Sequence, residues 1–282
     1  MCKPRSMLQT SPMSSARFAR SFTMIMLALT GASAAAHAQG CAFASLGEGH
    51  VNEIIDGRGF RLSDGREIRL AGIELVASDP KPAKSDGALS RILRDQDVIL
   101  QGENDAPDRY GRQSAFVVLS SSKALVQELL LAEGEALVSS DIAEKDCAAR
   151  LLAAEAGARA AKKATWASPA VIKNAESPDD ILTGIGRFTV VEGRVLSVRQ
   201  AGATTYLNFG RNWIRDFAVT ISRRMMPAVE TAGLVPKSLE NQRIRVRGWV
   251  EAHGGPRIDV RFPGQIEVLS GNETAEVWTK HE

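Results

Sequence analysis

Two short stretches of the chain carry arginines and carboxylates at spacings that suit contact with a phosphate group. The first is the turn Asp56-Gly57-Arg58-Gly59, which is followed by Arg69 and Glu74. The second is Asp108-Arg109-Tyr110-Gly111-Arg112. The two stretches can act together only if the fold brings them to one place, so the elements around them decide the chemistry.

Three of these arginines are candidate phosphate-binding residues. Guanidinium groups hold phosphate through paired hydrogen bonds, so Arg58, Arg69 and Arg112 could bind one phosphate without a metal. The alternative is structural. In that case Arg69 and Arg112 form salt bridges with Glu74 or Asp108 at the barrel mouth, and Arg58 is a solvated turn residue.

The surrounding segment is predicted to be a small β-barrel with helices packed on it. Residues 50–73 are expected to form three strands, because Asp64-Gly65 supplies the positive φ that a tight hairpin needs. Helices with one apolar side are expected at 85–94, 124–132 and 146–163, and strands at 97–101 and 112–119. Five strands with helices after the third and fifth predict an OB-type barrel, in the mainly β with α (α+β) class.

A second, smaller OB-like β-domain is expected in the C-terminal part. Strands alternating with turns follow residue 187, with one helical stretch near 224–234. The predicted organisation is a signal peptide at 1–38, a first domain at 39–166, a linker at 167–184, the second domain at 185–270 and a loose tail at 271–282.

The order and spacing of the motifs resemble the thermonuclease family, the calcium-dependent staphylococcal-nuclease-like enzymes. The resemblance covers residues 50–166 and includes Gly72-Ile73 behind Arg69 and a closing helix that ends near Trp166. It implies hydrolysis of phosphodiester bonds in DNA or RNA. Position by position, it implies catalytic roles for Arg69, Arg112 and Glu74, with Arg69 and Arg112 holding the phosphate, and calcium ligands at Asp56 and Glu74.

The chain departs from the family pattern at two chemically important positions. Arg58 stands where the family has a second metal-binding aspartate, and Ala77 stands where it has the glutamate that activates water. A guanidinium about 4 Å from a divalent ion costs on the order of 8 kcal/mol at an effective dielectric of about 20. Loss of a positioned general base typically slows a reaction about 10²- to 10⁴-fold. Asp79 lies two residues beyond Ala77 and is the nearest replacement, although Pro80 argues against matching geometry.

Three functions follow as alternatives. The first is an exported thermonuclease-like protein that has lost catalysis and keeps a phosphate-binding, nucleic-acid-binding or structural role, with single-stranded nucleic acid or a nucleotide phosphate as partner. The second is an active nuclease that uses calcium with rearranged ligands. The third is an envelope interaction protein without a nucleic-acid role.

The N-terminus predicts export to the periplasm or the medium. Basic residues precede an apolar run at 22–31, and Ala36-His37-Ala38 fits a signal-peptidase site, after which no apolar stretch is long enough to span a membrane. Loss of residues 1–38 with their four basic residues would change the net charge from +2 to −2. Cys41 and Cys147 would remain, and a disulfide between them is expected in an oxidising compartment. Lipidation of Cys41 is the alternative.

Aromatic residues and arginines also alternate in the predicted second domain. They could stack on bases and bind phosphates of a single strand, or they could be core residues beside a solvated sheet face. The residues concerned are Tyr206, Phe209, Trp213, Phe217, Trp249, Arg211, Arg215, Arg245 and Arg247.

Overall fold

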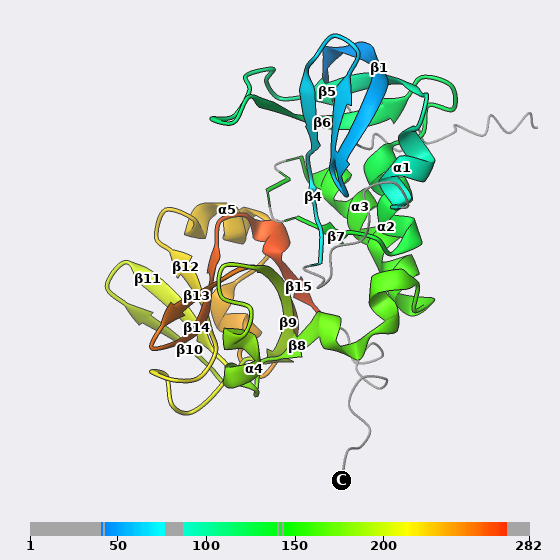
Figure 1. Cartoon of the computed structure of the whole chain (residues 1–282). Coiled ribbons are helices and arrows are strands. Elements are labelled where there is room, and N and C mark those ends of the chain that lie inside the picture. Colours follow the sequence, from blue (N-terminus) through cyan, green and yellow to red (C-terminus); the bar gives the residue numbers. More distant parts are fainter. Residues whose placement is uncertain (1–40, 42, 77–86, 140, 143, 270–282) are drawn as a thin grey trace, which may run out of the picture. The chain divides into compact units, whose positions relative to one another are not determined.

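A computed structural model describes residues 41, 43–76, 87–139, 141–142 and 144–269 (Figure 1). The predicted signal peptide and C-terminal tail lie outside these residues, as do Ala77 and Asp79. Within the described part of the chain, no helix has the length and apolar character needed to cross a membrane.

The first domain contains a closed five-stranded barrel, as predicted. Its strands lie in the order β1-β2-β3-β6-β5, with β3 and β6 parallel and the other pairs antiparallel. Burial alternates along β2, β3 and β5, so one face of each strand fills the barrel. The strands are β1 (Ala44–Asp56), β2 (Gly59–Leu62), β3 (Glu67–Leu70), β5 (Asp97–Gly102) and β6 (Arg112–Leu119).

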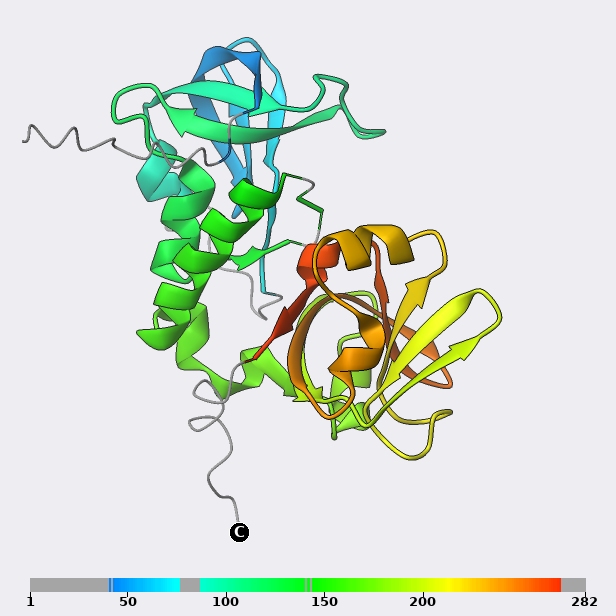
Figure 2. The same ribbon diagram turned by 180° about the vertical axis from the view of Figure 1, so that it is seen from behind.

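Three helices and a short two-stranded sheet accompany this barrel. Helices α2 (Val126–Glu133) and α3 (Lys145–Ala160) lie side by side in both views (Figure 2) and share the barrel's hydrophobic core with α1 (Ala88–Leu93). Gly134 ends α2 in the left-handed conformation, with φ 79°. β4 (Ile73–Glu74) pairs with β7 (Leu137–Val138) and carries Glu74 away from β3.

The second domain repeats the key connection of the first. β12 and β14 are parallel neighbours, as β3 and β6 are, and antiparallel strands flank them in the order β10-β11-β12-β14-β13-β9. The sheet therefore supports the predicted OB-like topology. Its elements are β9 (Phe188–Arg194), β10 (Ser197–Ala201), β11 (Thr204–Asn208), β12 (Ala218–Ser222), α5 (Met226–Thr231), β13 (Arg243–His253), β14 (Gly255–Val260) and β15 (Ile266–Val268).

The segment 167–184 is more ordered than a linker. It contains β8 (Ile172–Asn174), which extends the second sheet alongside β9, and the short helix α4 (Pro178–Leu182). Ile172 and Ile181 are buried. Ile181 belongs to the core of the second domain, and Ile172 packs in a smaller cluster that also contains Leu137 and Trp166 of the first domain, so this predicted linker buries apolar surface against both.

Candidate active site

In the turn after β1, the side chain of Asp56 is hydrogen-bonded to the backbone of the turn. Oδ1 of Asp56 accepts a hydrogen bond from the backbone N of Arg58 at 2.9 Å. A Cβ at Gly59 would lie 3.1 Å from the same oxygen, so a residue without a side chain suits this closely folded turn. Asp56 remains exposed.

Arg58 turns inward and neutralises Glu74. Its Nη1 lies 2.6 Å from Oε2 of Glu74 and donates to the backbone O of Ile73 at 2.7 Å. The side chains of Arg58 and Glu74 are only 11% and 15% exposed. The expectation that Arg58 is a solvated turn residue is therefore wrong, because a partly buried carboxylate lies within its reach on β4.

Glu74 ionises less readily than an ordinary glutamate. Burial raises its pKa, and the hydrogen bond and charge of Arg58 offset only part of this effect, while nearby Asp141 raises the pKa further. The carboxylate of Glu74 thus depends on the guanidinium beside it.

The second stretch forms a loop built around Asp108. Oδ1 of Asp108 accepts hydrogen bonds from the backbone N of Tyr110 and of Arg112, and Oδ2 accepts from Nε and Nη2 of Arg112 at 3.0 and 2.7 Å. Hydrogen bonds from Arg112 lower the pKa of Asp108 to about 2. Arg112 therefore forms the salt bridge to Asp108 that the sequence offered as an alternative to phosphate binding.

The fold brings the two stretches near each other. Strand β3, which carries Arg69, pairs with β6, which begins at Arg112, and Glu67 of β3 is in register with Arg112. Arg69 lies on β3, between Gly59 of β2 on one side and Ser114 of β6 on the other. It is partly buried. Asp56, Arg58 and Arg69 thus belong to one end of the β1–β2–β3 sheet.

The described residues do not fit a calcium ion at this place. Calcium takes six to eight oxygen ligands, mainly from carboxylates. Asp56 and Glu74 are the two predicted ligands, but Glu74 is paired with Arg58. Among the residues that the structure describes, no three His, Cys, Asp or Glu side chains come together as a metal site.

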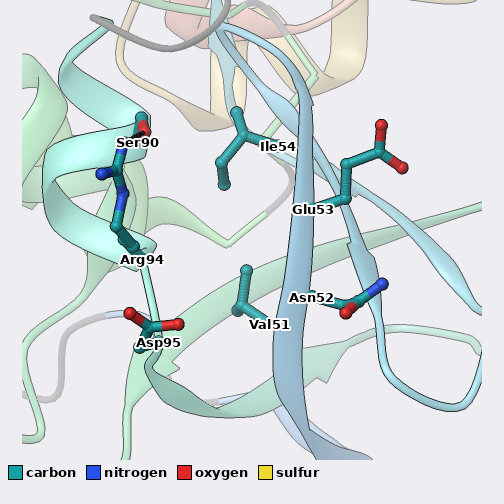
Figure 3. Close-up of a pocket in the computed structure, with 7 residues that line it drawn as sticks. All are labelled: Val51, Asn52, Glu53, Ile54, Ser90, Arg94 and Asp95. Carbon is teal, nitrogen blue, oxygen red and sulfur yellow. Dashed lines mark hydrogen bonds between the residues drawn. The ribbon is translucent and has the colours of Figure 1, made fainter.

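A pocket of about 270 Å³ lies elsewhere on the first barrel, between β1 and α1 (Figure 3). Residues 51–54 of β1 form one wall, and Ser90, Arg94 and Asp95 form the other. None of the predicted site residues lines this pocket, so it offers no support for the predicted chemistry.

A comparison with protein families identifies the first domain. Residues 68–168 match the family described as staphylococcal nuclease homologue. The chain therefore carries a staphylococcal-nuclease-like domain, as the motifs indicated. No curated protein matches the chain.

The predicted cysteine pair comes together in the structure. Cys41 and Cys147 are placed in a disulfide with their Cα atoms 4.2 Å apart and a sequence separation of 106. Both side chains are buried, and Cys147 lies in the first turn of α3. The two cysteines are thus close enough for the predicted disulfide, and lipidation of Cys41 stays an untested alternative.

A buried ion-pair cluster, which the sequence analysis did not predict, joins the two domains. Arg247 of β13 is fully buried and donates from Nη1 and Nη2 to the two oxygens of Glu155 on α3, at 2.9 and 3.0 Å. Arg247 also pairs with Glu267, and Arg245 pairs with Glu192 and Glu267. The prediction that Arg245 and Arg247 face solvent or a nucleic acid is therefore wrong. The sequence signal that could have indicated this cluster is the run of three arginines at alternate positions in β13, which need acidic partners from other parts of the chain if they are buried.

Proposed function

We propose that this is an exported nuclease-like protein that does not hydrolyse phosphodiester bonds and acts instead by binding. The observation that carries the proposal is the Arg58–Glu74 ion pair. A side-chain cation lies against the carboxylate that the family resemblance assigns to calcium.

The proposal has a direct chemical basis. Arg58 is held by Glu74 and by the backbone O of Ile73. The negative charge of the Glu74 carboxylate is therefore already balanced by a cation and attracts a divalent ion less strongly. Ala77 adds no general base, since a methyl group cannot accept a proton. Without a metal and a base, water is neither polarised nor deprotonated.

Phosphate binding at the barrel mouth is also weakened. Arg112 donates two side-chain hydrogen bonds to Asp108, and Arg58 is tied to Glu74. A phosphate would have to share Arg112 with Asp108 and Arg58 with Glu74. We therefore propose that the first domain serves mainly as a scaffold, and that contact with nucleic acid does not depend on it.

The test is a cleavage assay on the purified chain without residues 1–38, using single-stranded DNA and RNA with Ca²⁺, Mg²⁺ or Mn²⁺. We expect no chelator-sensitive cleavage and no heat of calcium binding by calorimetry. Chelator-sensitive cleavage that disappears in Arg112→Ala would refute the proposal and establish an active nuclease.

A gain-of-function variant provides the positive control. Arg58→Asp restores a carboxylate, releases Glu74, and should introduce measurable calcium binding. Adding Ala77→Glu supplies a candidate base, and the double variant should cleave faster than Arg58→Asp by up to about 10²- to 10⁴-fold. A matched variant, Arg58→Met, removes the cation without adding a ligand and should bind no calcium.

A further inference from the structure

The exposed charge of the second domain is predominantly basic. Over residues 185–269 the exposed charged residues are nine basic and one acidic, Glu230, and the side chains of Glu251 and Asp259 are in addition 37% and 38% exposed. Most of the acidic groups are partly or fully buried, including Glu192 and Glu267 of the ion-pair cluster. The exposed basic residues are Arg187, Arg194, Arg199, Arg211, Arg215, Arg223, Arg224, Lys237 and Arg261. Such a surface attracts polyanions even though the whole chain is near neutral.

A polar pocket of about 240 Å³ lies on this domain across β11, β12 and β14. Tyr206 of β11 is in register with Thr220 of β12, which is in register with Asp259 of β14. Hydroxyl groups of Thr204 and Ser222 and the guanidinium groups of Arg257 and Arg261 complete the pocket. One aromatic ring, several hydroxyl groups and two cations thus share one sheet face.

The carboxylates of this face are already partnered. Asp259 accepts a hydrogen bond from Thr220 and lies 3.2 Å from Nε of Arg257. Glu251 lies 3.5 Å from Arg257 and 3.6 Å from Arg261. The side chain of Arg261 is 66% exposed, so most of its donors face solvent. The acidic groups therefore position the arginines and leave cationic donors accessible.

The loop that joins β11 to β12 presents a further aromatic side chain. Trp213 is 74% exposed, between Arg211 and Arg215. The loop is held by Asn212, whose backbone N donates to Asp216 at 2.7 Å and whose backbone O accepts from the N of Asp216 at 2.8 Å. The tryptophan is thus exposed on a loop with a defined backbone.

We propose that the second domain binds single-stranded nucleic acid along β11, β12 and β14 and the loop that joins β11 to β12. Bases stack on Tyr206 and Trp213, and phosphates contact Arg261 and the arginines beside Trp213. Charge complementarity selects a polyanion, and two accessible aromatic rings select one with unpaired bases. This inference rests on the nucleic-acid partner of the proposed function, but it places the contact in the second domain rather than at the barrel mouth.

The structure also sorts the residues that the sequence offered for this role. Phe209 and Phe217 are buried in the core, and Arg245 and Arg247 lie in the ion-pair cluster. Those four residues cannot contact a strand. Trp213, Arg211 and Arg215 are exposed and Tyr206 lines the pocket, so these remain available.

The experiment is fluorescence anisotropy of a labelled oligothymidylate of about 16 nucleotides, with the chain from residue 39 at low salt in EDTA. We expect Tyr206→Ala and Trp213→Ala each to weaken binding by about 5- to 150-fold, since base stacking contributes about 1–3 kcal/mol. Arg261→Ala should reduce the slope of log K against log salt by about 0.7 for each phosphate that the variant no longer neutralises.

Matched variants distinguish this face from the rest of the protein surface. Tyr206→Phe keeps the ring and should bind as the wild type does, and Lys145→Ala removes an exposed cation from the first domain and should have little effect. Because Trp213 is exposed, its variant tests the site even if Tyr206→Ala fails to fold. EDTA prevents metal-dependent cleavage, so an active nuclease would refute the proposed function without affecting this readout.

Three results would overturn the inference. The first is no binding by the wild type at low salt. The second is unchanged binding in both Tyr206→Ala and Trp213→Ala, or loss of binding in Arg112→Ala alone. The third is that phosphatidylglycerol vesicles bind through Trp213 whereas the oligonucleotide does not, which would identify the face as a lipid contact.

Discussion

Replacing Glu155 by glutamine should strongly destabilise the protein, because it leaves a fully buried arginine without its main counter-charge. Glu155 is 0% exposed and accepts hydrogen bonds from the backbone N of Val138 at 2.6 Å, from Arg247 at 2.9 and 3.0 Å, and from Arg159 at 3.3 Å. A glutamine would place an amide donor against these donors. Breaking a buried pair in this way costs about 3–5 kcal/mol.

The assay is urea unfolding and thermal unfolding of the chain from residue 39. A loss of about 3–5 kcal/mol corresponds to a fall in Tm of about 6–20 °C for a chain of this size. The matched control is Glu128→Gln, which breaks the half-exposed ion pair between Glu128 and Arg150 and should cost about 0–1 kcal/mol.

A double variant distinguishes the buried charge from simple loss of packing. Combining Glu155→Gln with Arg247→Met removes the uncompensated cation and fills the space with apolar atoms, so it should recover much of the lost stability. Equal effects of Glu155→Gln and Glu128→Gln on the free energy of unfolding would refute this reasoning, as would a double variant with strictly additive losses.

Three further predictions concern the first domain. Asp108 should titrate with a pKa of about 2 in carbon-13 NMR. Because the folded-state pKa of Asp108 is lowered, the ionised side chain stabilises the fold fully above the unfolded pKa of about 3.9, and this stabilisation is lost as the pH falls towards about 2. An NMR midpoint at the ordinary pKa would contradict the Arg112 salt bridge. Reducing the Cys41–Cys147 disulfide should lower the free energy of unfolding by about 4–5 kcal/mol, because the unfolded chain gains entropy. Urea unfolding with and without reductant measures this loss, and an unchanged unfolding curve would argue against the bond. Glu74 should titrate above its ordinary range, and Arg58→Met should raise its pKa further. Since the folded-state pKa is raised, ionisation of Glu74 lowers the free energy of unfolding as the pH rises through that pKa. An unshifted NMR midpoint would show that Glu74 is solvated.

The fold could be predicted because local signals and long-range pairing agree. Asp64-Gly65 lies in the turn between β2 and β3, and Gly134 ends α2 in the conformation that favours glycine. The strands predicted at 97–101 and 112–119 lie within a residue of β5 and β6. The strand and the helix within 167–184 could not be predicted, because polar turn residues outnumber Ile172 and Ile181 there. The burial of these two isoleucines depends on the sheet beside them.

The candidate site could be predicted only in part, because side-chain pairing depends on distances that sequence spacing does not give. Arg58 and Glu74 are sixteen residues apart, and only the course of β4 places their charged atoms 2.6 Å from each other. In β13, the sequence does not show that α3 supplies Glu155 as a partner for Arg247. Arg247 is therefore fully buried, whereas the sequence offered it for phosphate binding or for a solvated sheet face.

The exchange at position 58 has two consequences that act together. An arginine there removes a carboxylate from the proposed metal site, and it also supplies the counter-charge that the remaining Glu74 would otherwise obtain from a bound cation. A partly buried carboxylate without any cation would be costly. With Arg58 in place, Glu74 obtains a counter-charge from the chain itself. Under the proposed function, Arg58 would account both for the lost metal site and for the stability of the carboxylate that remains, and contact with a ligand would fall to the second domain.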